Sequence, residues 1–134
     1  MRALSSSALL GALCLATAAG AQSPKQIIQH YETAARAAPG FVGFSADRGA
    51  AFFKATHGAE WSCSSCHDNP SAPGRHAKTG KTIAPLAPSA NAERFTAIDK
   101  SEKWFRRNCN DVLKRDCTAL EKGDVLAYLM SLAR

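Results

Sequence analysis

The sequence predicts an all-α fold. No stretch of strand length alternates apolar and polar residues, so nothing in the sequence indicates a sheet. Apolar residues recur instead at helical spacing after Ser23 and again after Thr118. The second of these segments opens with a capping box, in which Glu121 follows Thr118 by three positions. These patterns predict helices at both ends of the chain.

The first 21 residues have the pattern of a secretory signal peptide. Met1-Arg2 precedes a short apolar run over 8–18, which ends in the small residues Ala19-Gly20-Ala21. We expect cleavage after Ala21, which also removes Cys14. The run is too short for a confident membrane span, and no later segment approaches about 18 apolar residues. The sequence therefore predicts a soluble, periplasmic protein with no membrane span in the mature chain.

The mature chain is long enough for one compact domain. Removing 21 of 134 residues leaves 113, and the formal net charge falls from +6 to +5 because Arg2 is the only charged residue lost. We predict an N-terminal helical extension over 22–44, followed by the main domain over 45–134. In the extension, Ser23-Pro24 has the form of an N-cap and a first helical residue, and the helix is expected to end near Pro39-Gly40.

The main domain is expected to begin and end with a helix. Ser45 can cap the first of these helices, in which Gly49, Phe52 and Phe53 fall on neighbouring turns. A glycine inside a helix costs about 1 kcal/mol relative to alanine, which suggests that another backbone approaches there. The final helix, opened by Thr118, carries an apolar stripe. The stripe consists of Val125, Leu126, Leu129 and Leu132.

Between these helices lies Cys63-Ser64-Ser65-Cys66-His67, the pattern of covalent c-type haem attachment. In such a site both sulfurs bond to the porphyrin vinyl groups and the histidine becomes an axial iron ligand. A zinc site would need a second ligand pair at similar spacing, but Cys109 and Cys117 are eight positions apart with no histidine nearby. A redox dithiol would be expected in a βαβ context, which is missing. We predict one haem c held by Cys63, Cys66 and His67.

The segment after the haem motif is predicted to be a loop. Residues 68–90 contain six prolines and glycines, which break both helices and strands, so this segment should wrap one face of the haem. A short helical turn over 92–95 and a helix over 102–107, capped by Asp99 or Ser101, are expected to follow.

Cys109 and Cys117 are the two mature cysteines outside the haem motif. In an oxidising compartment they are natural disulfide partners, with seven residues between them. The alternative is a pair of free buried thiols.

With this order of elements, residues 45–134 resemble a class I cytochrome c. Residues 47–53 and 124–129 match the two helices that cross over the haem in that class. An electron carrier of this fold usually binds iron through a methionine in the loop before the last helix. No methionine occurs there, and Met130 on the terminal helix is better explained as a packing residue.

Three other histidines are candidate iron ligands, and one proline is a candidate partner of the ligating histidine. His76 lies in the loop that should cover the His67 side of the haem, while His57 and His30 are typical of surface histidines. The resemblance to class I cytochromes also implies that the Pro85 carbonyl accepts the Nδ1 hydrogen of the ligating histidine. An ordinary loop proline is the alternative.

The region before the last helix narrows the resemblance to the sphaeroides haem protein family, called SHP, a group of exported monohaem cytochromes. The matching segments are residues 81–90, 103–104, 107–110, 115–118 and 121–122. In that family the asparagine before the first loop cysteine binds the oxidised iron, which implies Asn108 as sixth ligand beside a Cys109–Cys117 disulfide. From the residues alone, Asn108 fits a helix C-cap equally well, and Asn110 is the second candidate.

Ligation by Asn108 would have a functional consequence. An amide oxygen is a weak, hard donor that suits ferric iron better than ferrous iron. We therefore expect a high-spin ferric protein in which reduction releases Asn108, so that O2, NO or CO can bind and accept a hydrogen bond from the amide. The alternative is a plain low-spin electron-transfer cytochrome with a histidine, such as His76, as sixth ligand.

The basic residues near the predicted ligand loop indicate what kind of partner could bind there. Six basic residues surround the predicted ligand loop, namely Lys100, Lys103, Arg106, Arg107, Lys114 and Arg115. They can steer an acidic redox partner, or they can form an ordinary solvated face. The family resemblance implies a dihaem cytochrome c as electron donor. Nucleic acid is not expected, since no binding motif accompanies the charge. The sequence leaves open whether the protein is an enzyme that uses oxygen or NO.

Overall fold

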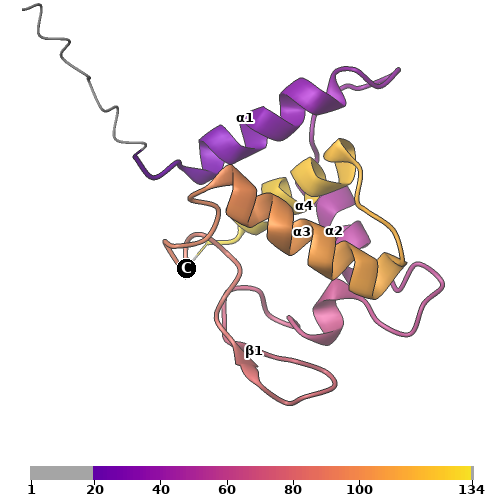
Figure 1. The fold of residues 1–134 in the computed structure, drawn as a ribbon, viewed down its shortest axis with the longest axis vertical. Helices are drawn as coiled ribbons and strands as arrows, with labels where there is room; N and C mark the ends of the chain where they lie inside the picture. Colours follow the sequence, from indigo (N-terminus) through magenta and orange to yellow (C-terminus); the bar gives the residue numbers. More distant parts are fainter. Residues whose placement is uncertain (1–19, 134) are drawn as a thin grey trace, which may run out of the picture.

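The computed structural model describes residues 20–133 and confirms the all-α class. Its four α-helices are α1 (Pro24–Ala35), α2 (Ala46–Lys54), α3 (Ile98–Leu113) and α4 (Ala119–Ser131), and a 3₁₀ turn, η1 (Cys63–Ser65), holds the haem motif. Figure 1 shows these helices grouped together, with a long loop extending away from them. The predicted signal peptide lies outside the described residues except for Gly20 and Ala21. Within residues 20–133, the helices are too short or too polar for a membrane crossing.

Three helices begin where the sequence predicts. Ser23 caps α1 in a capping box with Gln26, and Ser45 caps α2. At the start of α4, Thr118 Oγ1 accepts from the Glu121 backbone N–H, and a Glu121 carboxylate oxygen accepts from the Thr118 N–H at 2.8 Å. Each cap satisfies a backbone donor that the helix itself leaves unpaired, an effect of about 1 kcal/mol. The positions at which these three helices begin are therefore determined by residues within three positions of each start.

Helix α3 is longer than the predicted segment 102–107. It spans 16 residues, and neither Asp99 nor Ser101 caps it, because Ala97 occupies the N-cap position. The helix ends at Lys114, whose backbone is left-handed with φ 60°. Asn108 therefore lies inside helix α3. The prediction that Asn108 is a helix C-cap is wrong, and so is the prediction that it lies in a loop. The C-terminal half continues because Cys109 lies on its buried face.

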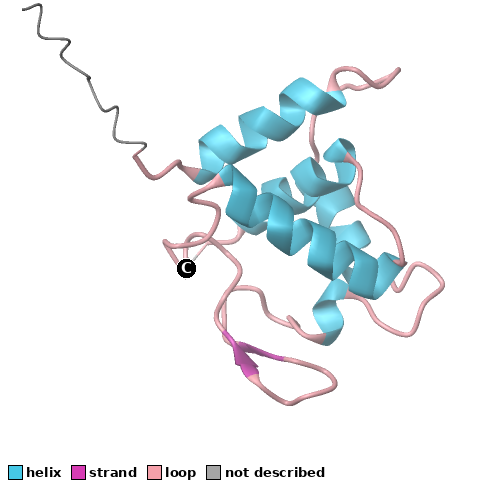
Figure 2. Cartoon of the chain, in the orientation of Figure 1, coloured by secondary structure: helices cyan, strands magenta, loops and turns pink. Residues whose placement is uncertain are grey.

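The proline-rich loop contains a small hairpin that the sequence did not predict. Strand β1 (Gly74–Arg75) pairs antiparallel with β2 (Thr82–Ile83), with Gly74 opposite Ile83 and Arg75 opposite Thr82. Figure 2 shows this hairpin away from the helices. Strands of two residues are too short to produce an alternating pattern, which explains the missed prediction.

Helices α2 and α4 pack closely at Gly49. A side-chain carbon at this position would overlap the backbone carbonyl of Asp124, so the glycine does permit a close backbone approach. The rings of Phe53 and Tyr128 lie next to this contact, 5.6 Å apart. Arg48 forms an ion pair with the buried carboxylate of Asp124 at 2.8 Å, which links the same two helices.

The N-terminal extension packs against the main domain. Ile27 and Tyr31 of α1 are buried together with Leu126 of α4. Phe105 of α3 meets the Tyr31 ring edge to face at 5.7 Å. The extension therefore contributes to the same core as the main domain, while the boundary between residues 44 and 45 stays a prediction.

Candidate haem site

The haem motif forms one tight turn. The Cys66 N–H and the His67 N–H both donate to the Cys63 carbonyl, at 3.3 and 3.2 Å. Ser62, the N-cap of η1, donates its backbone N–H to the Ser65 hydroxyl at 2.9 Å. The turn brings the two cysteines and the histidine together, and both cysteines are free, half-buried thiols.

Cys63 lies against the apolar core. It packs with the buried side chains of Phe53, Val125 and Leu129, beside the partly buried Leu86 and Phe105. Burial raises the pKa of the Cys63 thiol to about 11, so this sulfur is protonated at neutral pH. A catalytic redox dithiol instead needs a thiolate with a lowered pKa. The surroundings of Cys63 therefore argue against that alternative.

His67 carries a half-buried imidazole that is neutral at physiological pH. Burial, and then the positive charge of Arg94, lower the His67 pKa to about 4. A neutral imidazole keeps a free nitrogen lone pair, which is the state that binds a metal. Its Nδ1 atom is buried and has no hydrogen-bond partner within residues 20–133.

The β1–β2 hairpin packs directly on the motif. A side-chain carbon at Gly74 would overlap the Cys66 carbonyl and would lie 3.0 Å from His67 Nδ1. The Arg75 N–H donates to the Cys66 carbonyl at 2.9 Å, and the Ala77 N–H donates to Cys66 Sγ at 3.3 Å. The hairpin thus fixes the Cys66–His67 segment, and only glycine fits at position 74.

The expected contact between Pro85 and His67 is absent. The Pro85 carbonyl accepts instead from Arg94 Nε at 2.9 Å and from Asn91 Nδ2 at 3.2 Å. Arg94 also donates from Nη2 to the Ala84 carbonyl at 2.9 Å. Sequence reasoning missed Arg94, which ties down the loop beside His67. Nothing in the pattern around Arg94 distinguishes it from a surface arginine.

Cys109 and Cys117 form the predicted disulfide, with their Cα atoms 5.7 Å apart. Both are buried, at 6% and 7% exposure. Cys109 is in the last two turns of α3, and Cys117 directly precedes Thr118, the N-cap of α4. The disulfide therefore links the end of one helix to the beginning of the next.

Asn108 and Asn110 differ in whether their side-chain amides form hydrogen bonds. Asn110 Nδ2 donates to the Arg106 carbonyl at 2.8 Å and to an Asp116 carboxylate oxygen at 2.7 Å. The Asn108 amide, which is exposed, makes no hydrogen bond to any residue in the described range. Asn108 follows the buried Ser101 by seven positions, about two helical turns, so both lie on the same face of α3.

The other candidate ligands have different surroundings. His76 Nδ1 accepts from the Lys78 and Thr79 N–H groups at 3.2 and 3.3 Å, within the hairpin that packs on the His67 side. His57 Nε2 lies 2.8 Å from the Phe52 carbonyl oxygen. His30 is exposed on α1 and Met130 is 40% exposed on α4.

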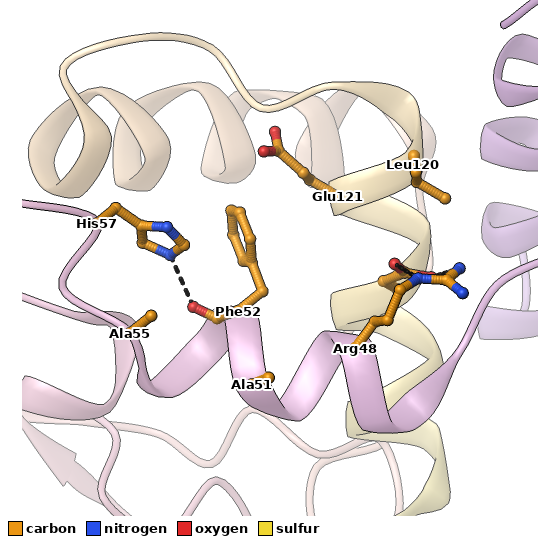
Figure 3. A pocket seen from close by; sticks show the side chains of 8 residues that line it. Arg48, Ala51, Phe52, Ala55, His57, Leu120 and Glu121 are labelled. Atoms are coloured by element: carbon orange, nitrogen blue, oxygen red, sulfur yellow. Dashed lines mark hydrogen bonds and ion pairs between the residues drawn. The ribbon is translucent and has the colours of Figure 1, made fainter. Parts of the chain in front are cut away.

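A separate cleft of about 410 Å³ lies between α2 and α4. It is lined by Arg48, Ala51, Phe52, Ala55, His57, Leu120, Glu121 and Asp124. Figure 3 shows the His57 ring beside Phe52, with ring centres 4.4 Å apart. Its charged groups are already paired, Arg48 with Asp124 and Glu121 with Arg115. The cleft contains no residue of the haem motif.

The basic residues near Asn108 are mostly on the exposed side of α3. Lys100, Lys103, Arg106 and Arg107 are exposed, and Arg107 lies over the Trp104 ring at 5.7 Å. Trp104 is itself 41% exposed. Arg115 is less available to an acidic partner than these residues, because it already forms an ion pair with Glu121 at 2.6 Å.

The residues of this site fit a covalently attached haem. Two free thiols and a neutral imidazole lie on one turn, and apolar side chains of the kind that surround a porphyrin pack against Cys63. The buried Nδ1 of His67 has no hydrogen-bond partner in the described chain, so this nitrogen is not tied up by another residue. A zinc site is not supported, since residues 20–133 hold no group of three or more metal-binding side chains.

Comparison with known proteins gives consistent matches. Residues 39–129 match a family described as a domain of unknown function, DUF1924. The cytochrome c-type protein SHP of Cereibacter sphaeroides is 46% identical over 115 residues, which cover 83% of this chain and 85% of SHP. A solved structure described as oxidized SHP, an oxygen binding cytochrome c, has 47% identity and a TM-score of 0.73, and covers 84% of this chain and 100% of that one.

Cytochrome c'' of Methylophilus methylotrophus is also similar. The crystal structure of its oxidized form is 39% identical, has a TM-score of 0.72, and covers 83% of this chain and 95% of that one. A solution structure of the same cytochrome has a TM-score of 0.70 and covers 83% of this chain and 94% of that one. It is described as giving insights into the structural basis of haem-ligand detachment.

Proposed function

This chain belongs to the DUF1924 family and is an SHP-like c-type cytochrome with a cytochrome c fold, and from that premise we propose a specific function. It is an exported, periplasmic monohaem protein, high-spin when ferric, in which Asn108 is the sixth iron ligand. Reduction releases Asn108, and the site then binds O2, NO or CO. Electrons come from another cytochrome.

Cys63, Cys66 and His67 would hold the cofactor. When bound, haem c would supply an iron that alternates between ferric and ferrous states and that can bind a further small ligand. Cys63 and Cys66 would hold the porphyrin through thioether bonds, and His67 would bind the iron through a ring nitrogen. The hairpin on Cys66 and the glycine at 74 keep this side rigid, as their contacts with Cys66 and His67 indicate.

Asn108 would provide the exchangeable side of the site. The observation that carries this proposal is that the Asn108 amide has no partner in the described chain, whereas the Asn110 amide makes two hydrogen bonds. Binding by Asn108 thus requires no internal bond to break, and its release leaves a free amide that can donate to a bound gas. A weak neutral donor suits release on reduction.

The disulfide would limit how far Asn108 moves. Cys109, the next residue, is tied to Cys117 at the start of α4. This link would keep helix α3 in place, so that rotation of the Asn108 side chain alone would be enough to move its amide. The solved structure of SHP is described as that of an oxygen binding cytochrome c. This similarity supports a gas-binding role for the present chain.

The electron donor would dock near α3. Four exposed basic residues and a partly exposed tryptophan lie on this helix, a combination that suits an acidic protein surface. We propose a dihaem cytochrome c as this partner.

Absorption spectra of the reduced holoprotein, with and without CO, test the gas-binding function. We expect a high-spin ferric spectrum and a rapid spectral change when CO is added after reduction. The Asn108→Ala variant should change the ferric spectrum, and the matched variant Asn110→Ala should leave it as in the native protein. A low-spin spectrum in both oxidation states without a CO adduct would instead identify a plain electron carrier with a histidine such as His76 as sixth ligand.

A further inference from the structure

Gln22 caps helix α3 from a distant part of the chain. Its backbone N–H donates to the Thr96 carbonyl at 2.8 Å, and its side-chain Oε1 accepts from the Ile98 N–H at 2.8 Å. Ala97, the N-cap of α3, has no side chain that could do this, and its backbone is extended with φ −154° and ψ 135°. The Thr96 carbonyl and the Ile98 N–H therefore face the same side. Figure 1 shows the beginning of α1 beside the beginning of α3.

We propose that Gln22 becomes a pyroglutamate that stays docked on α3. This inference rests on the proposed export and cleavage after Ala21, which makes Gln22 the first residue. The free α-amine then attacks the side-chain carbonyl carbon Cδ. A bond forms between the α-nitrogen and Cδ, the bond from Cδ to Nε2 breaks, and the nitrogen leaves as ammonia. No oxidant or reductant is needed.

The reaction keeps both atoms that Gln22 uses for docking. Oε1 becomes the lactam oxygen, and the α-nitrogen keeps one hydrogen as the lactam N–H. The group that leaves, Nε2, makes no hydrogen bond within the described part of the chain. In the five-membered lactam, the N–H and the oxygen lie on one edge of a cis amide. This edge faces the Thr96 carbonyl and the Ile98 N–H, so both contacts persist.

Electrostatics favours the cyclised form. An uncyclised Gln22 would carry an ammonium group directly before Ser23, the N-cap of α1, and within hydrogen-bond distance of the Thr96 carbonyl, just before the N-cap of α3. Both helix N-termini carry partial positive charge, and a cation there is unfavourable. Cyclisation converts the ammonium into a neutral amide. The lactam N–H also resembles the amide N–H that donates to Thr96.

Intact-mass analysis and N-terminal sequencing of the exported holoprotein test the modification. The expected chain begins at residue 22, is lighter than its sequence by one ammonia, and is blocked to stepwise degradation. The Gln22→Glu variant, which keeps a carboxylate oxygen but cyclises far more slowly, should be open. A native chain that begins at Gln22 with its full mass overturns cyclisation and leaves the export proposal standing. A cleaved chain that begins at another residue overturns both cleavage after Ala21 and cyclisation, and an uncleaved chain overturns the export proposal as well.

Hydrogen exchange tests whether the lactam is docked. The Ile98 amide should be protected in the native protein and should exchange at least about tenfold faster in Gln22→Ala, because its acceptor is removed. A matched variant, Gln29→Ala on the exposed side of α1, should leave Ile98 unchanged. Equal exchange at Ile98 in the native protein and in Gln22→Ala would overturn the docking, whatever the mass of the chain.

Discussion

The segment around His67 and the helix around Asn108 present two different kinds of surroundings for an iron ligand. Around His67, the imidazole is half-buried with its Nδ1 atom inaccessible, the hairpin bonds to Cys66, and Gly74 allows contact so close that no side chain fits. Around Asn108, the amide is exposed and makes no bond to the described chain. Only the backbone of the second region is fixed, through the disulfide next to it.

This difference fits a division of roles between the two axial ligands that we propose, His67 and Asn108. A ligand that must stay bound benefits from a rigid turn with a locked neighbour, because any displacement then has a packing cost. A ligand that must leave benefits from a rigid backbone and a side chain without competing bonds. The structure of this chain provides the first arrangement at His67 and the second at Asn108.

The largest expected effect is at the attachment residues. Replacing both Cys63 and Cys66 with serine should abolish covalent haem attachment, because both thioether bonds are lost. Haem staining after acid-acetone extraction and denaturing electrophoresis measures this. The double variant Cys109→Ser with Cys117→Ser should keep its covalent haem. If that variant lost its haem and the first one retained it, the roles assigned to the two cysteine pairs would be reversed.

Gly74→Val tests the rigidity of the His67 side. The new side chain would overlap the Cys66 carbonyl, and we expect a loss of about 3 kcal/mol in the free energy of unfolding of the holoprotein from overpacking. Chemical denaturation followed by far-UV circular dichroism measures it. Ala77→Val, at an exposed position of the same hairpin, is the control and should change stability by less than about 0.5 kcal/mol. Equal stability of both variants would show that the hairpin does not restrain the motif.

Removal of the disulfide tests the backbone restraint on the Asn108 side. Closing the short loop between Cys109 and Cys117 should stabilise the fold by about 2.6 kcal/mol in the chain-entropy model. The double serine variant should lose a similar amount and should also broaden the ferric spectrum, since Asn108 is held less uniformly. Unchanged stability together with an unchanged spectrum would remove the disulfide from this role.

The smallest expected effect on stability comes from Asn108 itself. Because its amide has no partner in the described chain and the proposal releases it on reduction, Asn108→Ala should leave the unfolding free energy of the reduced holoprotein within about 0.5 kcal/mol of native. Asn110→Ala should cost about 1 kcal/mol, because it loses the bonds to Arg106 and Asp116. Denaturation of both variants side by side measures the difference, and the opposite ranking would contradict the contrast between the two amides.

Features encoded within a few residues could be predicted from the sequence. Ser23, Ser45 and Thr118 cap their helices through hydrogen bonds that span three positions, so the sequence alone reveals them. The haem motif and the pairing of Cys109 with Cys117 follow from spacing and from the number of cysteines.

Features that depend on distant contacts could not be predicted. The start of α3 is capped by Gln22, 76 positions away, so neither Asp99 nor Ser101 marks it. The Pro85 carbonyl has several donors within reach, and only the folded loop selects Arg94 and Asn91 over His67. The difference between Asn108 and Asn110 likewise arises from the position of Asp116 beyond the end of the helix.

The most direct test of the account is a pair of crystal structures of the holoprotein, one ferric and one ferrous, from the same crystal form. We predict that the Asn108 amide oxygen binds the iron in the ferric form and has turned away from it in the ferrous form, while His67 and the Cys109–Cys117 disulfide keep their positions. A ferrous structure with Asn108 still bound to the iron, or with an imidazole in its place, would contradict the account.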